Sequence, residues 1–392
     1  MAKKFSDLPL LKTKNKHYPL FYPYISKKSL KSISNVLNSR WIGQGPLVDK
    51  FEKNFKKKFA KKKHCVAVGS GTDALHLAYI LADLKKDDEI IAPIFTCTAT
   101  NIPLLYQGVK IKFADIDLDT MNISVDHVKK LITKKTKAIV FVNYGGIPCD
   151  LKELNDIKRK NNLFLIQDAA QSLGSKFKNK NITEFADFTI FSFQAIKHIT
   201  SGDGGILVFK DRKYLQKSKR IRWFGIDREK KQYGTWENDI KEIGYKYQMT
   251  DIGARLLLDS LSDFSKVLSH RKKIFSLYKK ELSKNKFVKV LDTKNKDLKN
   301  SYWLCTIIVY KDRLKLQKYL RKFNIETNQV HFRNDRYSIF IKGSIKNNTG
   351  LFKNMNFYED KYVVIPLNLK ITVTDALFIS KKINDFFYHE QH

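Results

Sequence analysis

Lys197 has the sequence setting that best suits covalent chemistry. An apolar stretch at residues 187–191 predicts a buried strand before it, and residues 206–209 predict a second strand after it. The segment between the two strands also carries Ser192 and the glycine-rich residues 202–205. A lysine held against a core loses hydration of its charged form, so its pKa falls and the neutral amine becomes a nucleophile toward a carbonyl. The alternative is a solvated loop lysine, but the aromatic, hydroxyl and glycine neighbours of Lys197 argue against it.

Residues 69–72, Gly-Ser-Gly-Thr, form a second motif with a chemical use. They follow a short apolar stretch at 65–68 and precede a helical pattern of apolar residues at 74–81. A strand, a glycine turn and a helix start bring free backbone N–H groups and the positive end of the helix dipole to an anion. The motif predicts a phosphate site, although Ser70 or Thr72 could also be an ordinary helix N-cap.

Asp168 ends another apolar stretch, at residues 163–167, that predicts a buried strand. A lone aspartate in this position is normally a helix cap or a loop hydrogen-bonder. In parallel sheets, however, ligands bind beyond the carboxyl ends of the strands, where Asp168, Ser192 and residues 69–72 would converge. Beside a nucleophilic lysine and an anion site, this carboxylate could hold a positive charge on a bound heteroaromatic ring.

The order of predicted elements indicates an α/β fold. Strand patterns alternate with helix patterns from residue 65 onward, which implies a largely parallel sheet flanked by helices. The link between the strands at 187–191 and 206–209 has no helical pattern and is barely long enough for a crossover. We therefore expect these two strands to pair antiparallel, which makes the sheet mixed but mostly parallel.

At 392 residues the chain is long enough for two domains. We expect a large domain over residues 1–245, whose N-terminal arm at 18–24 lies on other structure, and a smaller C-terminal α+β domain over residues 246–392. Residues 220–241 and 342–354 are expected to be exposed loops. Within the smaller domain the patterns predict strands at 303–309 and 361–365 and helices at 252–261, 314–323 and 374–387.

Composition narrows the classes of protein to consider. No apolar run is long enough for a membrane span, and the start of the chain lacks an apolar signal core, so we expect a cytoplasmic protein without a membrane partner. The four cysteines lack metal spacing. The net charge of +35 raises the possibility of nucleic-acid binding, but the charge is spread along the chain and no recognition motif accompanies it. A generic solvated surface is the better interpretation, and attraction of anionic substrates fits either one.

A nucleophilic lysine, a ring-pairing carboxylate and a phosphate site are the three parts that a pyridoxal phosphate (PLP) enzyme needs. With these parts the sequence resembles the DegT/DnrJ/EryC1/StrS sugar aminotransferases over nearly its whole length. The resemblance rests on ordered motifs: Trp-Ile-Gly-Gln-Gly-Pro at 41–46, Gly-Ser-Gly-Thr-Asp-Ala-Leu at 69–75, Gln-Asp-Ala-Ala-Gln at 167–171, Ser-Phe-Gln-Ala-Ile-Lys at 192–197, Gly-Asp-Gly-Gly at 202–205 and Gly-Tyr-Lys-Tyr-Gln-Met-Thr-Asp at 244–251.

The resemblance implies PLP fold type I and a homodimer with shared active sites. It implies that Lys197 bonds to the cofactor and later moves a proton between the cofactor and substrate carbons, while Asp168 keeps the pyridine nitrogen protonated. Sugar dehydratases of this family have histidine in place of that lysine, so its presence favours transamination. The resemblance also assigns residues to cofactor binding: Gln171 near the ring hydroxyl, Cys97 at a position where relatives often stack an aromatic residue on the ring, Gly71, Thr72 and Ser192 at the phosphate, and Lys246 or Gln248 reaching that phosphate from the partner subunit.

The implied reaction moves an amino group from L-glutamate to a nucleotide-linked keto sugar, for surface polysaccharide or glycan biosynthesis. A nucleotide diphosphate needs cations nearby, and we take Arg222, Arg228, His331 and Arg333 as candidates, although ordinary surface charge explains them equally well. One alternative is an aminotransferase for a keto-deoxy sugar acid. Another, from a different class, is a regulatory protein that keeps the fold and binds nucleic acid through its charge.

Overall fold

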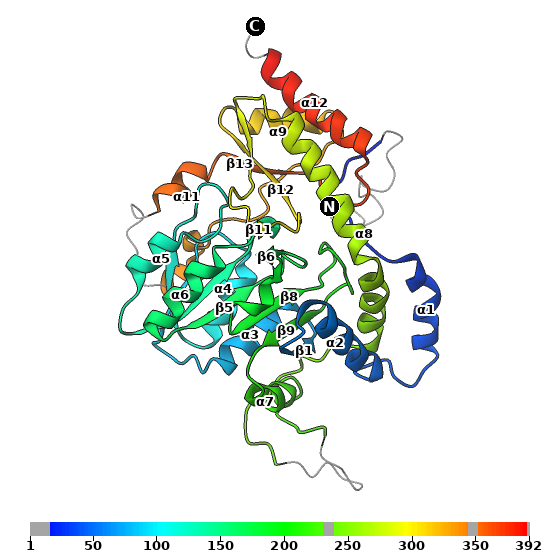
Figure 1. The fold of residues 1–392 in the computed structure, drawn as a ribbon, viewed down its shortest axis with the longest axis vertical. Helices are drawn as coiled ribbons and strands as arrows, with labels where there is room; N and C mark the ends of the chain where they lie inside the picture. The colour runs from blue at the N-terminus through cyan, green and yellow to red at the C-terminus, as the bar shows by residue number, and fades with distance from the viewer. Residues whose placement is uncertain (1–15, 230–238, 344–351, 390–392) are drawn as a thin grey trace, which may run out of the picture.

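A seven-stranded sheet organises the larger part of the molecule (Figure 1). The computed structural model describes residues 16–229, 239–343 and 352–389. Neighbouring strands are parallel except at β9, which is antiparallel to both β1 and β8. The predicted mixed, mostly parallel sheet is therefore confirmed. In spatial order the strands are β1 (His64–Val68), β9 (Gly205–Phe209), β8 (Phe188–Ser192), β5 (Phe164–Asp168), β4 (Thr136–Val142), β2 (Glu89–Pro93) and β3 (Lys110–Ala114).

Helices cover both faces of this sheet, because successive side chains of a strand point to opposite faces. On β1, Val66 and Val68 pack in one hydrophobic core, whereas Cys65 and Ala67 pack in the other. The first core also receives α3 (Gly71–Leu81), α4 (Thr98–Tyr106) and α7 (Lys213–Ile221). The second receives α2 (Pro46–Phe59), α5 (Val125–Leu131), α6 (Leu151–Asn161) and the start of α8 (Asp251–Glu281).

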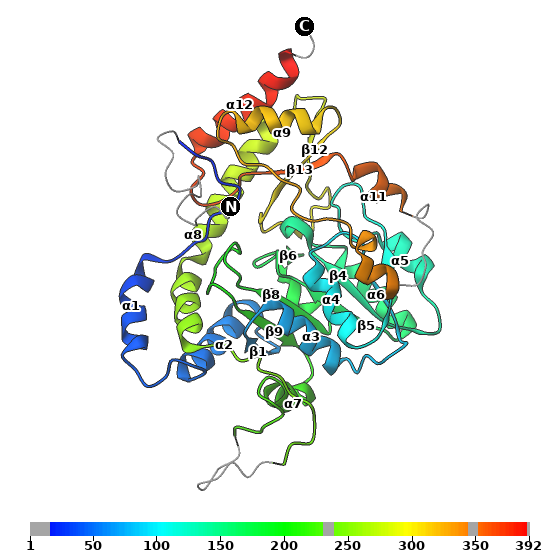
Figure 2. The ribbon, with the colours of Figure 1, turned by 180° about the vertical axis from the view of Figure 1, so that it is seen from behind.

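The C-terminal part of the chain forms a second, antiparallel sheet of β10 (Val288–Val290), β12 (Cys305–Val309) and β13 (Tyr362–Ile365). Helices α9 (Arg313–Arg321) and α12 (Val373–His389) pack with it in a third core. The long helix α8 runs from the large sheet to this second sheet (Figures 1 and 2). Its early residues Ala254 and Leu257 lie in the second core and its later residues Ile274 and Tyr278 in the third. The division into domains at residue 245 stays a prediction, and α8 itself contacts both parts.

Several smaller elements complete the fold. The predicted N-terminal arm is present: Tyr18 pairs with Ile325, and the Leu20 amide donates to the Glu326 carboxylate over 2.8 Å. Within the described ranges, no helix is both long and apolar enough to cross a membrane. Among the described residues, the remaining elements are α1 (Lys27–Leu37), β6 (Lys176–Phe177), β7 (Lys180–Asn181), β11 (Leu298–Lys299), α10 (Ser338–Gly343), α11 (Lys353–Tyr358) and three short 3₁₀ helices at Tyr144–Gly146, Ile182–Glu184 and Asn334–Arg336.

Two predicted loops contain helix. The start of the predicted loop at 220–241 is the end of α7, whose charged sequence hides the few apolar residues, among them Ile221, that pack on the sheet. The predicted loop at 342–354 begins in α10 and ends in α11, where Met355 anchors a short helix in the core. Residues 230–238 and 344–351 of these two loops lie outside the described residues. Both errors arise because a helix held by one or two core contacts has too few apolar positions to show a helical period.

Candidate active site

Lys197 lies in the turn that connects β8 to the antiparallel strand β9. The turn is held closed at its base, where the Phe193 amide donates to the Gly204 carbonyl over 2.8 Å. The Lys197 amide donates to the Gln194 carbonyl over 2.9 Å. Burial lowers the pKa of the Lys197 amine to about 8, against the opposing effects of Asp168 and Cys97. The side chain therefore lies in the partly desolvated setting that the sequence indicated.

Asp168 lies at the carboxyl end of β5 and is 5% exposed. Its Oδ2 accepts a hydrogen bond from Thr100 Oγ1 over 2.8 Å, and its Oδ1 accepts one from the Ala170 amide over 2.9 Å. Burial raises the pKa of the Asp168 carboxyl, whereas these two hydrogen bonds and the charge of Lys197 lower it. The hydrogen bonds also fix the direction of the carboxylate, because the fully buried Thr100 is itself hydrogen-bonded to Thr96 over 2.8 Å.

Three backbone segments meet closely at the start of α3. Ser70 is the helix N-cap, and its Oγ accepts a hydrogen bond from the Asp73 amide over 3.0 Å. A Cβ atom at Gly71 would lie 2.8 Å from Cβ of Ser192, so this position leaves no room for a side chain. A Cβ at Gly205 would lie 2.2 Å from the Ser70 carbonyl oxygen. The first N–H groups of α3, to which Thr72 belongs, and the Ser192 side chain thus lie at one helix N-terminus, which suits a phosphate group.

Gln171 and His331 form a polar pair beside Lys197. Gln171 Oε1 accepts from the Gly145 amide over 2.8 Å, and its Nε2 lies 3.1 Å from His331 Nε2. Burial, with a smaller effect from Lys197, lowers the pKa of His331 to about 3, so the imidazole is neutral at physiological pH. Cys97 is exposed at the N-cap of α4 and is near enough to Lys197 to affect its pKa. The structure thus brings Lys197, Asp168, Gln171, His331 and Cys97 together.

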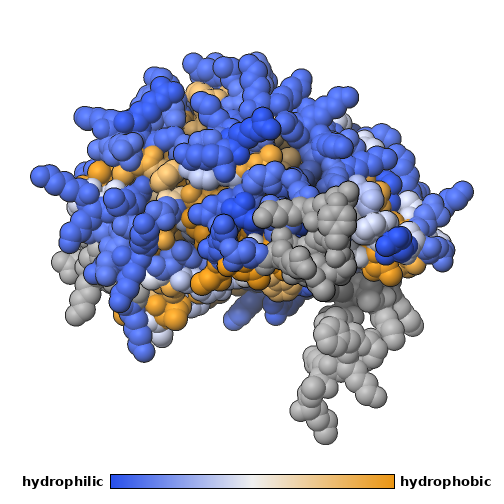
Figure 3. Space-filling model, turned by 90° about the horizontal axis from the view of Figure 1, so that it is seen from below, coloured by the Kyte–Doolittle hydropathy of each residue, from blue (hydrophilic) through white to orange (hydrophobic). Residues whose placement is uncertain are grey.

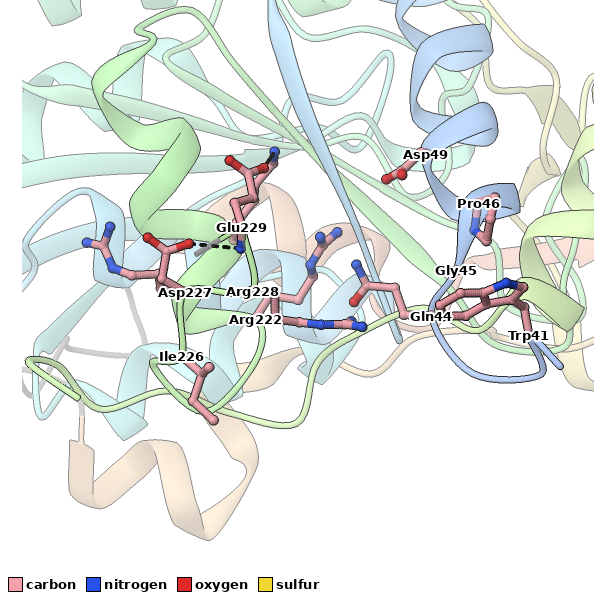
Figure 4. Close-up of a pocket in the computed structure, with 12 residues that line it drawn as sticks. Trp41, Gln44, Gly45, Pro46, Asp49, Arg222, Ile226, Asp227, Arg228 and Glu229 are labelled. Carbon is pink, nitrogen blue, oxygen red and sulfur yellow. Dashed lines mark hydrogen bonds and ion pairs between the residues drawn. The ribbon is translucent and has the colours of Figure 1, made fainter. Parts of the chain in front are cut away.

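Arg222 is held by groups of its own chain, although its buried Nε has no hydrogen-bond partner among the described residues. It is 4% exposed, and its Nη1 donates to Glu52 Oε1 and to the Ala67 carbonyl, each over 2.9 Å. Arg222 and the exposed Arg228 line one side of a hollow of about 290 Å³ that Trp41 and Gln44 line on the other (Figure 4). None of the residues around Lys197 described above lines this hollow.

The side chains of Arg333 and Lys246 contact other groups of their own chain. Arg333 is 2% exposed and forms ion pairs with Asp335, over 2.7 Å, and with Glu359, over 3.2 Å. The exposed Lys246 places its Nζ 4.2 Å from the centre of the Trp223 ring.

The stretch around Gln248 lies beside the phosphate-type turn of its own chain. The Gly69 amide donates to the Tyr247 carbonyl over 2.7 Å, and Gln248 pairs with Val68 at the end of β1. Gln248 Oε1 is buried without a hydrogen-bond partner among the described residues.

Two residues of the cluster were missed in the sequence. Thr100, described above, orients Asp168, and nothing in its surrounding sequence distinguishes it from other helical threonines. Trp303 places its ring 4.0 Å from Nζ of Lys197, measured to the ring centre. It comes from the chain just before β12, so no local pattern could connect it with the β8–β9 turn.

Comparison with known proteins decides the family. The model of the DegT/DnrJ/EryC1/StrS aminotransferase family matches residues 23–383. The chain belongs to this family. GDP-perosamine synthase of Escherichia coli O157:H7 is a relative, 34% identical over 323 residues that cover 81% of this chain and 85% of that protein. The predictions of an enzyme and of an aminotransferase are thereby confirmed.

Solved structures of this aminotransferase family share the whole fold. The sugar aminotransferase CalS13 of Micromonospora echinospora is 26% identical, with a TM-score of 0.87 over 94% of this chain and 99% of that one. Spr1654 of Streptococcus pneumoniae, solved in its PLP form, is 25% identical, with a TM-score of 0.85 over 94% of this chain and 98% of that one. The predicted fold of a PLP type I aminotransferase is confirmed.

Proposed function

We propose that this aminotransferase uses PLP to transfer an amino group from L-glutamate to a keto sugar carried by a nucleotide. The convergence of Lys197, Asp168 and the Gly71–Ser192 contact at one edge of the sheet carries the proposal. The family match and the relative that is named for a GDP-linked amino sugar support the substrate class. Such a product would serve surface polysaccharide or glycan biosynthesis.

The residues present fit PLP. A Cβ at Gly71 would fill the space beside Ser192, so this glycine leaves the helix N-terminus open to a phosphate. Ser192, Thr72 and the α3 amides would hold that phosphate, and the Asp168 carboxylate would pair with the ring nitrogen. When bound, the cofactor supplies an electron sink that stabilises negative charge on the substrate carbon.

The side chains at the site have separate tasks in this proposal. Lys197 Nζ, with a pKa of about 8, passes readily between its neutral and protonated forms near neutral pH, so it can accept a proton and return it. Burial raises the pKa of Asp168, and the hydrogen bonds from Thr100 and the Ala170 amide oppose this effect, because hydrogen bonds to a carboxylate favour its charged form. Gln171 Nε2 would donate to the ring hydroxyl, because its Oε1 is already used by the Gly145 amide.

The substrate phosphates need positively charged side chains nearby. Ion pairs within the chain already engage some of the candidate cations. Arg222 and Arg333 are each paired with buried or half-buried carboxylates of their own chain. Arg228 is exposed beside the hollow of Figure 4, which the Lys197 cluster of the same chain does not line, so in this proposal its charge would serve a diphosphate bound at the site of the partner subunit. His331 is neutral and would act as a hydrogen-bonding group.

A homodimer with shared sites completes the proposal. Lys246 is exposed, and Gln248 has a buried amide oxygen without a partner among the described residues. A second copy of the chain would give the Lys246 ammonium and the Gln248 Nε2 amide, which are hydrogen-bond donors, a phosphate to contact. The cytoplasmic location expected from the sequence stays a prediction.

The absorbance spectrum of the purified protein with PLP tests the cofactor and donor assignments. We expect a band near the visible edge that L-glutamate bleaches, that Lys197→Ala lacks, and that the exposed control Lys210→Ala retains. An unchanged spectrum in Lys197→Ala would remove that lysine from its role. A panel of GDP- and UDP-linked keto sugars and keto-deoxy sugar acids then tests the acceptor. Turnover of the acids alone would replace the nucleotide-sugar proposal, and nucleic-acid binding without a PLP band would favour a regulatory protein.

A further inference from the structure

The amine of Lys197 rests on an aromatic ring that comes from a distant part of the chain. Its Nζ lies 4.0 Å from the centre of the Trp303 ring, which is 3% exposed. A lysine ammonium over an indole face is attracted by the negative face of the ring, and the attraction grows when the pair is shielded from water. The contact therefore favours the protonated amine at a place where burial favours the neutral one.

Trp303 is held in this position from several sides. Its Nε1 donates to the Ile196 carbonyl over 3.0 Å, so the indole is bonded to the residue just before Lys197. Its amide donates to the Gly145 carbonyl over 2.9 Å. The fully buried Arg271 of α8 donates to the Trp303 carbonyl over 3.1 Å and to the Leu367 carbonyl over 2.7 Å. Turning the ring away would break its Nε1 bond to Ile196, and the two backbone bonds fix the place from which the side chain extends.

The backbone next to Trp303 adopts a conformation that costs free energy. Tyr302 has a φ of 57°, in the left-handed region that residues with a Cβ rarely adopt. Such a conformation persists only where the surroundings over-determine it, and it is most frequent at functional sites. Here the bonds of Trp303 and of Ser301, whose amide donates to Gly146 over 3.0 Å, supply that constraint.

Several charged and titratable groups surround Lys197, and they differ in how they affect the charge of its amine. Asp168 and Cys97 favour the ammonium form of Lys197. The nearby His331 and His198 are neutral. The Arg271 guanidinium bonds the backbone carbonyl of Trp303. Asp168 is also the carboxylate that the proposed function assigns to the cofactor ring. When that assignment holds, the Trp303 ring remains beside the amine to receive its positive charge.

We propose that Trp303 is a positioning residue that holds the amine of Lys197 whenever this amine is not bonded to the cofactor. The proposal rests on the proposed function only in taking Lys197 as the cofactor lysine. Trp303 would keep the amine beside Asp168 instead of letting it turn toward solvent, and would raise the fraction that carries a proton. The contact also makes the proton affinity of Lys197 depend on the C-terminal part of the chain.

The proton affinity of Lys197 in the full, cofactor-free chain provides the test. The rate at which an acetylating reagent modifies Lys197 is followed against pH by mass spectrometry of its peptide. In Trp303→Leu, which has no ring, we expect the apparent pKa of Lys197 to fall by about one unit. In Trp303→Phe, which keeps an aromatic ring, the apparent pKa of Lys197 should stay near its original value. Phe323→Leu removes the ring that lies 4.2 Å from Lys382 Nζ and should leave the Lys197 profile unchanged.

A folded Trp303→Leu protein with an unchanged or raised Lys197 pKa would overturn the proposal, because the ring would then only fill space. Circular dichroism and thermal unfolding establish whether the variants fold. Independently of that variant, the tryptophan fluorescence of the unmodified chain should change with pH as Lys197 titrates, and Lys197→Met should lack that change. Identical fluorescence titrations in the two proteins would equally refute the contact. Neither measurement requires bound cofactor, so the PLP spectrum tests the proposed function separately.

Discussion

Thr100 Oγ1 donates a 2.8 Å hydrogen bond to Oδ2 of Asp168, and both side chains are buried. The bond lowers the pKa of the Asp168 carboxyl, because it stabilises the charged form against the effect of burial. The residue that orients the Asp168 carboxylate therefore comes from α4, the helix that follows β2.

Thr100→Val should move the acid limb of the activity profile to higher pH. The variant keeps the shape of the side chain but removes the hydroxyl, so Asp168 becomes protonated at a higher pH and binds the ring nitrogen less well. We expect PLP affinity to fall about tenfold, the equivalent of one hydrogen bond to a charged group. Steady-state kinetics against pH measures the shift of the acid limb, and titration of PLP absorbance measures the loss of affinity. Thr98→Val in the first turn of α4 serves as the control, and an equal loss in this variant would assign the effect to the helix instead of the hydroxyl.

Gly71→Ala should weaken PLP binding far more than it weakens the fold. Its Cβ would lie 2.8 Å from Cβ of Ser192, so either α3 or the end of β8 must move where the phosphate is proposed to bind. We expect at least a tenfold loss of PLP affinity, about 1.4 kcal/mol. Gly43→Ala is the matched control, since no atom lies within 4 Å of the added Cβ. Equal PLP affinity in the two variants would place the phosphate elsewhere.

Arg222→Met should act on stability, whereas Arg228→Met should act on substrate affinity. Removing the Arg222 guanidinium leaves the buried Glu52 without its cation, which typically costs about 3 to 5 kcal/mol of unfolding free energy. Arg228 is exposed, so its variant should fold normally and raise KM for the nucleotide sugar. Urea unfolding and steady-state kinetics separate the two cases. Partial recovery of stability in Arg222→Met with Glu52→Gln would assign the loss to the unpaired carboxylate.

Lys197 should make the stability of the cofactor-free chain depend on pH in a defined window. Its pKa is about 8 when folded and 10.5 as a free side chain, so between these values the unfolded chain binds the extra proton. Stability contributed by this group therefore rises with pH through that window, by up to about 3 kcal/mol. Below pH 8 both states carry the proton and the contribution is constant. Urea unfolding of the original chain and of Lys197→Met at several pH values gives the difference, and a difference that does not vary with pH would contradict the low pKa.

The parts of the site that the sequence predicted share one physical feature. Lys197, Asp168 and residues 69–72 lie at strand ends, and the strands show as apolar runs, so the topology of a parallel sheet brings them together. The roles of the cationic side chains are harder to predict, because a buried, ion-paired arginine and a surface arginine look alike in a sequence. The sequence makes Arg222 a candidate phosphate ligand with surface charge as an equal alternative, and it hides the ion-pair partner Glu52, which lies 170 residues away in the chain.

The contact between Trp303 and Lys197 could not be predicted from the sequence. The Trp303 ring contacts Lys197 directly, and its place depends on tertiary bonds to Gly145 and Arg271 and on the strained backbone at Tyr302. None of these residues shares a period or a motif with the β8–β9 turn. A contact of this kind can be found only once the packing of the C-terminal sheet on the large sheet is known.

Shared active sites predict that two inactive variants restore each other when they are mixed. If Gln248 or Lys246 serves the phosphate of the partner subunit, a chain with Lys197→Ala and a chain with Gln248→Ala and Lys246→Ala can form a mixed dimer. One of its two sites carries both defects, and the other carries neither. After random exchange half of the dimers are mixed, so activity should recover to about a quarter of the original value. Mixing followed by a kinetic assay, with size-exclusion chromatography to establish the dimer, measures this recovery. If each site were built within one chain, every site in the mixture would keep one defect and activity would not exceed the average of the two variants.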